Sequence, residues 1–146
     1  MKSLIVYDSV YGNTKTIAET VAKELGSEAR VVPVSDFKTG DLKGVNLLVV
    51  GSPILGWQPS EKTRTFLAGL KPGQLKGIKA AAFDTRMTIF IHGDAAGKIA
   101  AQLAGAGAAV IADAVGFYVT GRQGPLKKGE LERAAAWART VKNQVQ

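Results

Sequence analysis

The sequence predicts an α/β fold built on a parallel sheet with helices on both faces, and two observations indicate it. Short apolar runs rich in β-branched residues alternate with segments whose apolar residues recur at helical spacing. The apolar runs are continuous, which is typical of strands that are buried on both faces of a parallel sheet. Repeated strand–helix–strand units of this kind build a layered sheet, because the strands are too few for an eight-stranded barrel.

The strands are predicted from these apolar runs. They are residues 3–7, 29–34, 47–52, 78–83 and 115–120, the last preceded by a short apolar pair at Val110 and Ile111. Pro33 lacks a backbone N–H, so we expect the second strand at an edge of the sheet.

The helices are predicted from apolar residues three and four positions apart. They are centred on residues 17–25, 66–70, 96–103 and 131–141. Gly26 is expected to end the first helix, Asp94 to cap the third, and Gly129 to lie near the start of the last. No repeat, low-complexity tract or linker divides the chain. A single domain over residues 1–146 is therefore expected.

Composition excludes several classes of site. The 146 residues include no cysteine and one histidine, which excludes disulfides and iron–sulfur clusters and makes a metal site improbable. Hydrophobic residues make up 46% of the chain, as in ordinary globular proteins. No apolar run reaches the length of a membrane span and no leader precedes the first strand, so a cytoplasmic protein is expected.

The chain is basic, with a formal charge of +7 from 19 Lys and Arg against 12 Asp and Glu. This charge favours an anionic ligand or an acidic partner protein. No dense basic run is interleaved with aromatic residues, so nucleic-acid binding is not favoured.

Three predicted loops meet at the carboxyl ends of the strands, where ligands bind in open parallel sheets. The first, residues 8–14, joins Gly12 to several hydroxyl and amide side chains at the start of a helix. Backbone N–H groups and the positive end of the helix favour phosphate binding there. The spacing is neither that of a Walker A loop nor that of a dinucleotide fingerprint, so a mononucleotide phosphate fits better. The alternative is a plain turn capped by Asn13 or Thr14.

The other two loops supply apolar groups. In the second, residues 51–60, Leu55 and Trp57 are positioned to stack on a flat aromatic ligand, or alternatively to be buried against the neighbouring helix. The third, residues 83–94, offers polar contacts and side chains that could cover a ring. These are Asp84, Thr85 and Arg86 for the polar contacts, with Met87, Ile89 and Phe90 for the ring. His92 has no obvious partner and is interpreted as a loop residue rather than a catalytic one.

The motif SVYGNT at residues 9–14, together with GSP at 51–53 and LG at 55–56, resembles the flavodoxin family. The resemblance covers essentially the full chain. It implies a five-stranded parallel sheet of order 2-1-3-4-5 that binds FMN noncovalently beyond the carboxyl ends of the strands. Two features depart from most of the family: Val10 and Tyr11 stand where hydroxyl residues are usual, and the chain is basic rather than acidic.

The resemblance also implies roles for individual residues. The first loop wraps the FMN phosphate, Leu55 lies against one face of the flavin, and Trp57 stacks on the ring or covers its edge. Gly56 aligns with a glycine whose peptide carbonyl turns toward N5 of the flavin, which glycine permits because both peptide orientations are accessible to it. The full set implied to bind the cofactor is Ser9, Val10, Tyr11, Gly12, Asn13, Thr14, Pro53, Ile54, Leu55, Gly56, Trp57, Asp84, Thr85, Arg86 and Phe90.

The expected function is therefore electron transfer by bound FMN, with acidic redox partner proteins. A basic shell, with Arg86 beside the site, is expected to make the final one-electron reduction less unfavourable than in acidic relatives. Two alternatives remain open: an FMN-dependent NAD(P)H:quinone-type oxidoreductase, and a non-redox binding or regulatory module on the same fold. The sequence assigns no oligomeric state.

Overall fold

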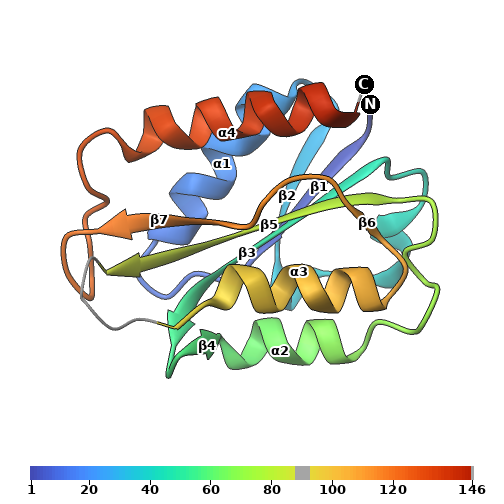
Figure 1. Ribbon diagram of the computed structural model, residues 1–146, viewed down its shortest axis with the longest axis horizontal. Helices are drawn as coiled ribbons and strands as arrows, with labels where there is room; N and C mark the ends of the chain where they lie inside the picture. The colour runs from blue at the N-terminus through green and yellow to red at the C-terminus, as the bar shows by residue number, and fades with distance from the viewer. Residues whose placement is uncertain (88–92, 146) are drawn as a thin grey trace.

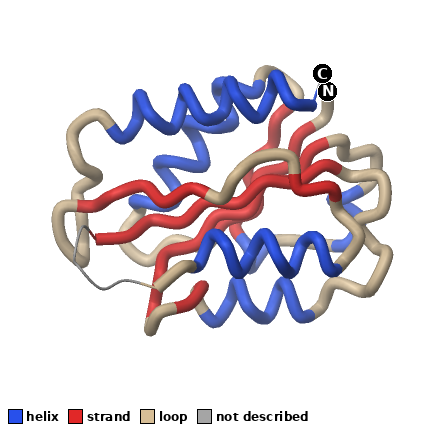
Figure 2. The backbone as a smooth tube through the Cα atoms, in the orientation of Figure 1, coloured by secondary structure: helices blue, strands red, loops and turns tan. Residues whose placement is uncertain are grey.

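The protein is a three-layer sandwich in which a central sheet lies between two pairs of helices (Figures 1 and 2). The structure is a computed structural model that describes residues 1–87 and 93–145. The predicted roles of Ile89, Phe90 and His92 lie outside the described residues. The strands are Ser3–Tyr7 (β1), Ala29–Pro33 (β2), Leu47–Leu55 (β3), Gln58–Pro59 (β4), Lys79–Met87 (β5), Ala109–Val110 (β6) and Val115–Val119 (β7).

The helices cover both faces of the sheet. They are Asn13–Leu25 (α1), Glu61–Ala68 (α2), Ala95–Gly105 (α3) and Glu130–Val145 (α4), with two 3₁₀ turns at Val34–Asp36 and Thr39–Leu42. Alternate side chains of β1 point to opposite faces of the sheet. Leu4 and Val6 belong to the core under α2 and α3, whereas Ile5 and Tyr7 belong to the core under α1 and α4. Among the described residues, no helix is both long and apolar enough to cross a membrane.

The predicted parallel order is confirmed, with one refinement. The sheet runs β2-β1-β3-β5, and both β6 and β7 then pair with β5 in parallel. Two short strands thus occupy the position of the expected fifth strand. The second strand lies at the opposite edge, as Pro33 indicated.

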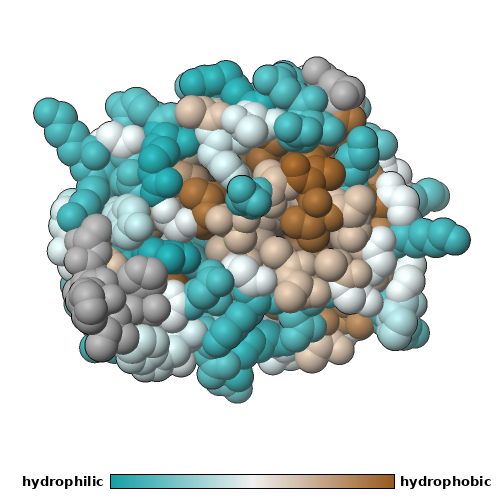
Figure 3. Space-filling view, viewed as in Figure 1, coloured by the Kyte–Doolittle hydropathy of each residue, from teal (hydrophilic) through white to brown (hydrophobic). Residues whose placement is uncertain are grey.

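The edge formed by β6 and β7 carries apolar side chains. Figure 3 shows hydrophobic residues gathered over β6 and the segment that follows it, and Val110 is exposed there. The break between β6 and β7 keeps each of these edge strands short, which limits their pairing with a strand of another chain.

The predicted ends of two strands are wrong. β3 extends to Leu55 and β5 to Met87, so the first halves of the predicted second and third loops belong to the sheet. The two strands stay paired as far as Pro53 and Thr85, and β7 pairs with β5 up to Met87. Hydrogen bonds between the strands thus continue beyond the apolar runs from which the prediction was made. Asp84, Thr85 and Arg86 therefore have fixed backbone positions rather than loop positions.

An aromatic cluster lies between the sheet and α4, beside the pairing of β3 with β5. The Phe83 ring centroid is 5.9 Å from that of Phe117 and 6.1 Å from that of Trp137, both with edge-to-face geometry. Gly51 lies opposite Phe83 in the register, and a Cβ at Gly51 would overlap the Phe83 ring. The glycine therefore leaves the space that this ring fills.

A two-residue hairpin joins β3 to β4. Leu55 pairs with Gln58, and the two residues between them, Gly56 and Trp57, have φ angles of 59° and 72°. Positive φ at both central residues is the geometry of a type I′ turn, which suits hairpins because its twist matches that of the strands. Glycine adopts this conformation freely, whereas a tryptophan in it is strained.

We predict that Gly51→Ala lowers the free energy of unfolding by about 1–3 kcal/mol, because the Phe83 ring has no free space into which to move. Gly105→Ala is the control, since a Cβ at Gly105 meets nothing within 4 Å. It should leave stability unchanged or raise it slightly, because alanine favours helix. Urea unfolding of both variants tests this. Equal stability of the two would contradict the role given to Gly51.

We predict that Trp57→Gly is more stable than Trp57→Ala by about 1 kcal/mol, the reverse of the usual order for these residues. Both variants remove the same indole contacts, so their difference isolates the backbone. Thermal or urea unfolding measures it, and a more stable alanine variant would show that position 57 does not hold a left-handed backbone.

Candidate functional site

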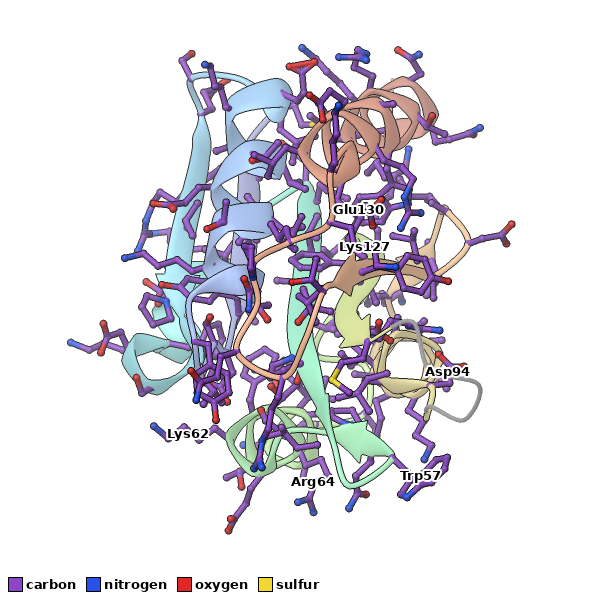
Figure 4. All side chains as sticks on the ribbon, turned by 90° about the vertical axis from the view of Figure 1, so that its left-hand side faces the viewer. Trp57, Lys62, Arg64, Asp94, Lys127 and Glu130 are labelled. Carbon is purple, nitrogen blue, oxygen red and sulfur yellow. The ribbon has the colours of Figure 1, made fainter. Side chains whose placement is uncertain are left out.

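A cavity of about 670 Å³ opens at the carboxyl ends of the strands. Its volume lies within the usual range for small-molecule and cofactor sites. Figure 4 looks onto this end of the sheet, where Trp57 and Asp94 are labelled. The cavity is lined by Ser9, Val10, Tyr11, Asn13, Thr14, Pro53, Ile54, Leu55, Gly56, Trp57, Thr85, Arg86, Met87, Gly93, Val119 and Arg122.

The first loop forms one end of this cavity. α1 begins at Asn13 with Gly12 as its N-cap, and the φ of Gly12 is 93°. The Ser9 Oγ accepts hydrogen bonds from the backbone N–H groups of Gly12, at 3.0 Å, and Lys15, at 3.4 Å. The alternative in which Asn13 or Thr14 caps a plain turn is therefore wrong. Gly12 does not line the cavity itself but allows the backbone turn that presents its neighbours.

A pair of buried hydroxyls joins the first loop to β5. The Oγ1 atoms of Thr14 and Thr85 are 2.8 Å apart, and both residues line the cavity. Either hydroxyl can donate to the other, so the donating one has used its only hydrogen and the other keeps its hydrogen for a further acceptor. This contact joins the start of α1 to β5 directly. The sequence predicted only that the loops following the two strands lie at the same edge of the sheet.

The β3–β4 hairpin forms the other end. Leu55 and Trp57 are 43% and 56% exposed as whole residues, so the alternative in which they are buried against a helix is wrong. The Trp57 backbone is held from outside the hairpin, because the Lys98 amine donates to its carbonyl at 3.2 Å. Gly93 lies against the same backbone so closely that a Cβ there would overlap it.

Buried hydroxyls hold the base of the hairpin. The Ser52 Oγ accepts from the Ser60 backbone N–H at 3.0 Å, and Ser60 in turn caps α2 by accepting from the Thr63 N–H. These bonds join the end of β3 to the start of α2. The hairpin therefore projects from a rigid base.

Asp84 does not line the cavity, and its predicted contact with the cofactor is corrected. Its side chain is fully buried, and its carboxylate accepts from Arg86 Nε at 2.7 Å and Nη2 at 2.6 Å. The same carboxylate accepts from the Ala96 backbone N–H at 2.8 Å, at the start of α3. Asp84 therefore positions Arg86 and α3, and its neighbours Thr85 and Arg86 line the cavity.

The ion pair fixes the charge of Arg86. The hydrogen bonds that Arg86 donates to the Asp84 carboxylate raise the pKa of the Arg86 guanidinium, against the lowering effect of burial. Asp94, which caps α3 as predicted, lies 3.7 Å from the same guanidinium. Gly116 leaves room for this group, since a Cβ at Gly116 would overlap it.

Sequence reasoning missed Gly93, Val119 and Arg122. Val119 ends β7, and Arg122 lies in the segment between β7 and α4. The rule that ligand sites lie beyond the carboxyl ends of parallel strands applies to the last strand as well, so it could have indicated this segment. Gly93 had no sequence signal, because its role depends on how closely it approaches Trp57. Among the described residues, no cluster of His, Cys, Asp or Glu side chains could hold a metal ion.

Comparisons with known proteins agree with this geometry. Residues 4–111 match the model of a flavodoxin domain family. A flavodoxin from Maridesulfovibrio salexigens is 35% identical over 126 residues, which cover 78% of this chain and 84% of that protein.

Solved structures show the same fold. Oxidised flavodoxin 2 from Bacillus cereus has a TM-score of 0.86 at 21% identity, and a Streptococcus pneumoniae flavodoxin has a TM-score of 0.82 at 19% identity. Each comparison covers 99% of both chains. The family match and the relative at 35% identity show that this chain belongs to the flavodoxin family, whose members bind FMN and transfer electrons to redox partners.

Proposed function

We propose that the cavity is the FMN site and that the chain, as a single domain over residues 1–146, carries electrons between redox partner proteins. The observation that carries this proposal is the division of the cavity lining into a polar end and an apolar end. FMN has the same two parts, a phosphate and a flat, largely apolar ring system. The donor set of the described residues therefore fits the cofactor.

The polar end suits the phosphate. The first N–H groups of a helix have no partner within the helix, and the helix dipole adds positive potential there. The Ser9 Oγ accepts from the N–H groups of Gly12 and Lys15 and keeps its own O–H for an anion. Asn13 and the hydroxyl pair of Thr14 and Thr85 complete the donors at this end.

The apolar end suits the flavin rings. Leu55 and Trp57 reach it from the hairpin, and Met87 from the end of β5. Aromatic and thioether groups pack well on flat conjugated rings. FMN, when bound, supplies the electron chemistry, and the residues of this chain hold and orient it.

A second hairpin geometry is compatible with the sequence of the Gly56–Trp57 turn. In the other common two-residue hairpin turn, type II′, only the first central residue needs a positive φ. Reversal of the peptide between Gly56 and Trp57 would thus move Trp57 out of the left-handed region, while Gly56 stays in it. This supports the carbonyl movement that the family resemblance implies for Gly56.

Three basic side chains labelled in Figure 4 lie at the end of the molecule that carries the cavity, where the acidic Asp94 and Glu130 also lie. Figure 4 shows Lys62 and Arg64 of α2 and Lys127 from the segment before α4 on the same side of the molecule as Trp57. With the formal charge of +7, this arrangement supports docking of acidic redox partners at the cavity mouth. The cytoplasmic location remains a prediction from the sequence.

We predict that Gly12→Val weakens FMN binding at least tenfold, because a β-branched residue is strained at a φ of 93° and distorts the loop. The matched control is Gly26→Val at the other end of α1, where φ is 115°. It should destabilise the protein as well but keep the FMN dissociation constant within about twofold, since Gly26 caps the end of α1 that lies away from the cavity, whereas Gly12 shapes the loop whose neighbours line it.

Calorimetric FMN titration of the protein freed of flavin, at a temperature where both variants are folded, measures this difference. Unchanged FMN affinity in Gly12→Val would remove the first loop from the site.

We predict that Lys62→Glu slows oxidation of the reduced, FMN-loaded protein by ferricyanide roughly twofold or more at low ionic strength. Lys76→Glu changes the net charge equally but lies before β5, at the opposite end of the sheet, so its effect should be smaller. Stopped-flow absorbance gives both rates. Equal slowing by the two variants would mean that net charge, rather than a docking face, governs the encounter.

A further inference from the structure

Two arginines line the cavity, and they differ in their partners. Arg86 is paired with the buried carboxylate of Asp84 at 2.6 Å and lies 3.7 Å from that of Asp94. Arg122 forms no ion pair or side-chain hydrogen bond with the described residues, and it is exposed. Arg122 therefore brings a positive charge to the cavity wall that the described part of the chain does not neutralise.

Arg122 lies at the end of the cavity that the first loop forms. The Asn13 Nδ2 donates to the Gln123 carbonyl at 3.3 Å. Gly124 is packed so tightly against the Asn13 side chain that a Cβ at Gly124 would overlap it. These contacts place the segment around Arg122 beside the start of α1 and away from the hairpin.

This segment is held in shape by its own hydrogen bonds. The Thr120 N–H donates to the Pro125 carbonyl at 2.8 Å, and the Lys127 N–H donates to the Tyr118 carbonyl at 2.9 Å. At its base, the Glu130 carboxylate accepts from the Tyr118 N–H at 2.7 Å. The hydrogen bond from Arg133 lowers the pKa of Glu130, which keeps this acceptor ionised at neutral pH. Arg122 is thus presented from a fixed turn.

The neutral and acidic groups around the first loop do not supply the full positive charge that would balance a bound phosphate dianion. The helix dipole and the hydroxyls offer only partial charges, and the Asp8 carboxylate, which accepts from the Ser9 N–H at 3.0 Å, is an anion beside the same loop. A phosphate dianion placed at this loop would be repelled by Asp8. A guanidinium on the cavity wall offsets that repulsion and can donate two parallel hydrogen bonds to phosphate oxygens.

We propose that Arg122 binds the phosphate of FMN and makes the cavity select the phosphorylated flavin over riboflavin. This inference rests on the proposed function, because it assigns a residue to the same site. It adds a cationic contact from a segment beyond residue 111, where the match to the family model ends.

The test compares FMN and riboflavin as ligands of the flavin-free full chain, with flavin fluorescence as the readout. Arg122→Gln should weaken FMN binding about tenfold, the loss expected for one exposed charge-assisted hydrogen-bond contact. The affinity for riboflavin should stay within about twofold. Arg122→Lys should retain part of the preference, because it keeps the charge and loses the bidentate geometry.

Lys15→Gln is the matched control, since Lys15 is an exposed cation in the first turn of α1 that does not line the cavity. It should change FMN affinity less than Arg122→Gln does. In addition, FMN affinity should fall less steeply with salt in Arg122→Gln than in the unmodified chain. Thermal unfolding should be the same for all variants, because both positions are exposed.

The outcomes separate the two claims. If the unmodified chain prefers FMN to riboflavin and Arg122→Gln keeps that preference in full, the inference is wrong and the proposed site stands. Equal weakening of both flavins by Arg122→Gln, or an equal loss of FMN affinity in Lys15→Gln, would also overturn the inference. If the unmodified chain binds neither flavin, the proposed function fails and the inference with it.

Discussion

The site depends most on the hydrogen bonds that the buried carboxylate of Asp84 accepts. This carboxylate holds the Arg86 guanidinium through two hydrogen bonds and accepts the Ala96 N–H at the start of α3. The end of β5 and the beginning of α3 are thereby fixed to each other. A buried carboxylate requires such partners, because an unpaired charge in the interior would cost several kcal/mol. Its neighbour Thr85 can then meet Thr14 at a defined position on the cavity wall.

The ion pair between Asp84 and Arg86 reduces the effect of the chain's positive charge inside the cavity. The net charge of +7 led to the expectation of a basic shell around the flavin that includes Arg86. Instead, Asp84 and Asp94 balance the charge of Arg86, so its electrostatic effect inside the cavity is much reduced. Positive charge near the cavity also comes from Arg122 on its wall and from Lys62 and Lys127 at the same end of the molecule (Figure 4). Positive charge at the cavity wall and mouth favours the binding of anions. It has less effect on the electronic environment of the flavin rings.

Much of the fold could be predicted because it depends on local patterns. The apolar runs predicted the strands and their parallel arrangement. Pro33 indicated an edge strand, Gly26 the end of the first helix, and Asp94 the cap of the third. The first loop was recognisable because glycine, hydroxyls and an amide follow a buried strand directly. The ends of β3 and β5 were missed because polar residues such as Asp84 and Thr85 pair with neighbouring strands as well as apolar ones do. In such cases the partner strand, rather than the residue's own polarity, decides where the sheet ends.

The sequence alone determined the class of the fold and the loops that meet at one edge of the sheet, because both follow from hydrophobic spacing and turn chemistry along a short segment. Most of the side chains that line the cavity were implied by the resemblance of these loops to the flavodoxin family. The tertiary structure decided which polar groups face the cavity and which are used internally. Asp84 and Arg122 show the difference: one carboxylate is consumed by partners on β5 and α3, and one guanidinium reaches the cavity from a segment more than a hundred residues after the first loop. Such assignments depend on distances between segments remote along the chain, and local periodicity contains no information about them.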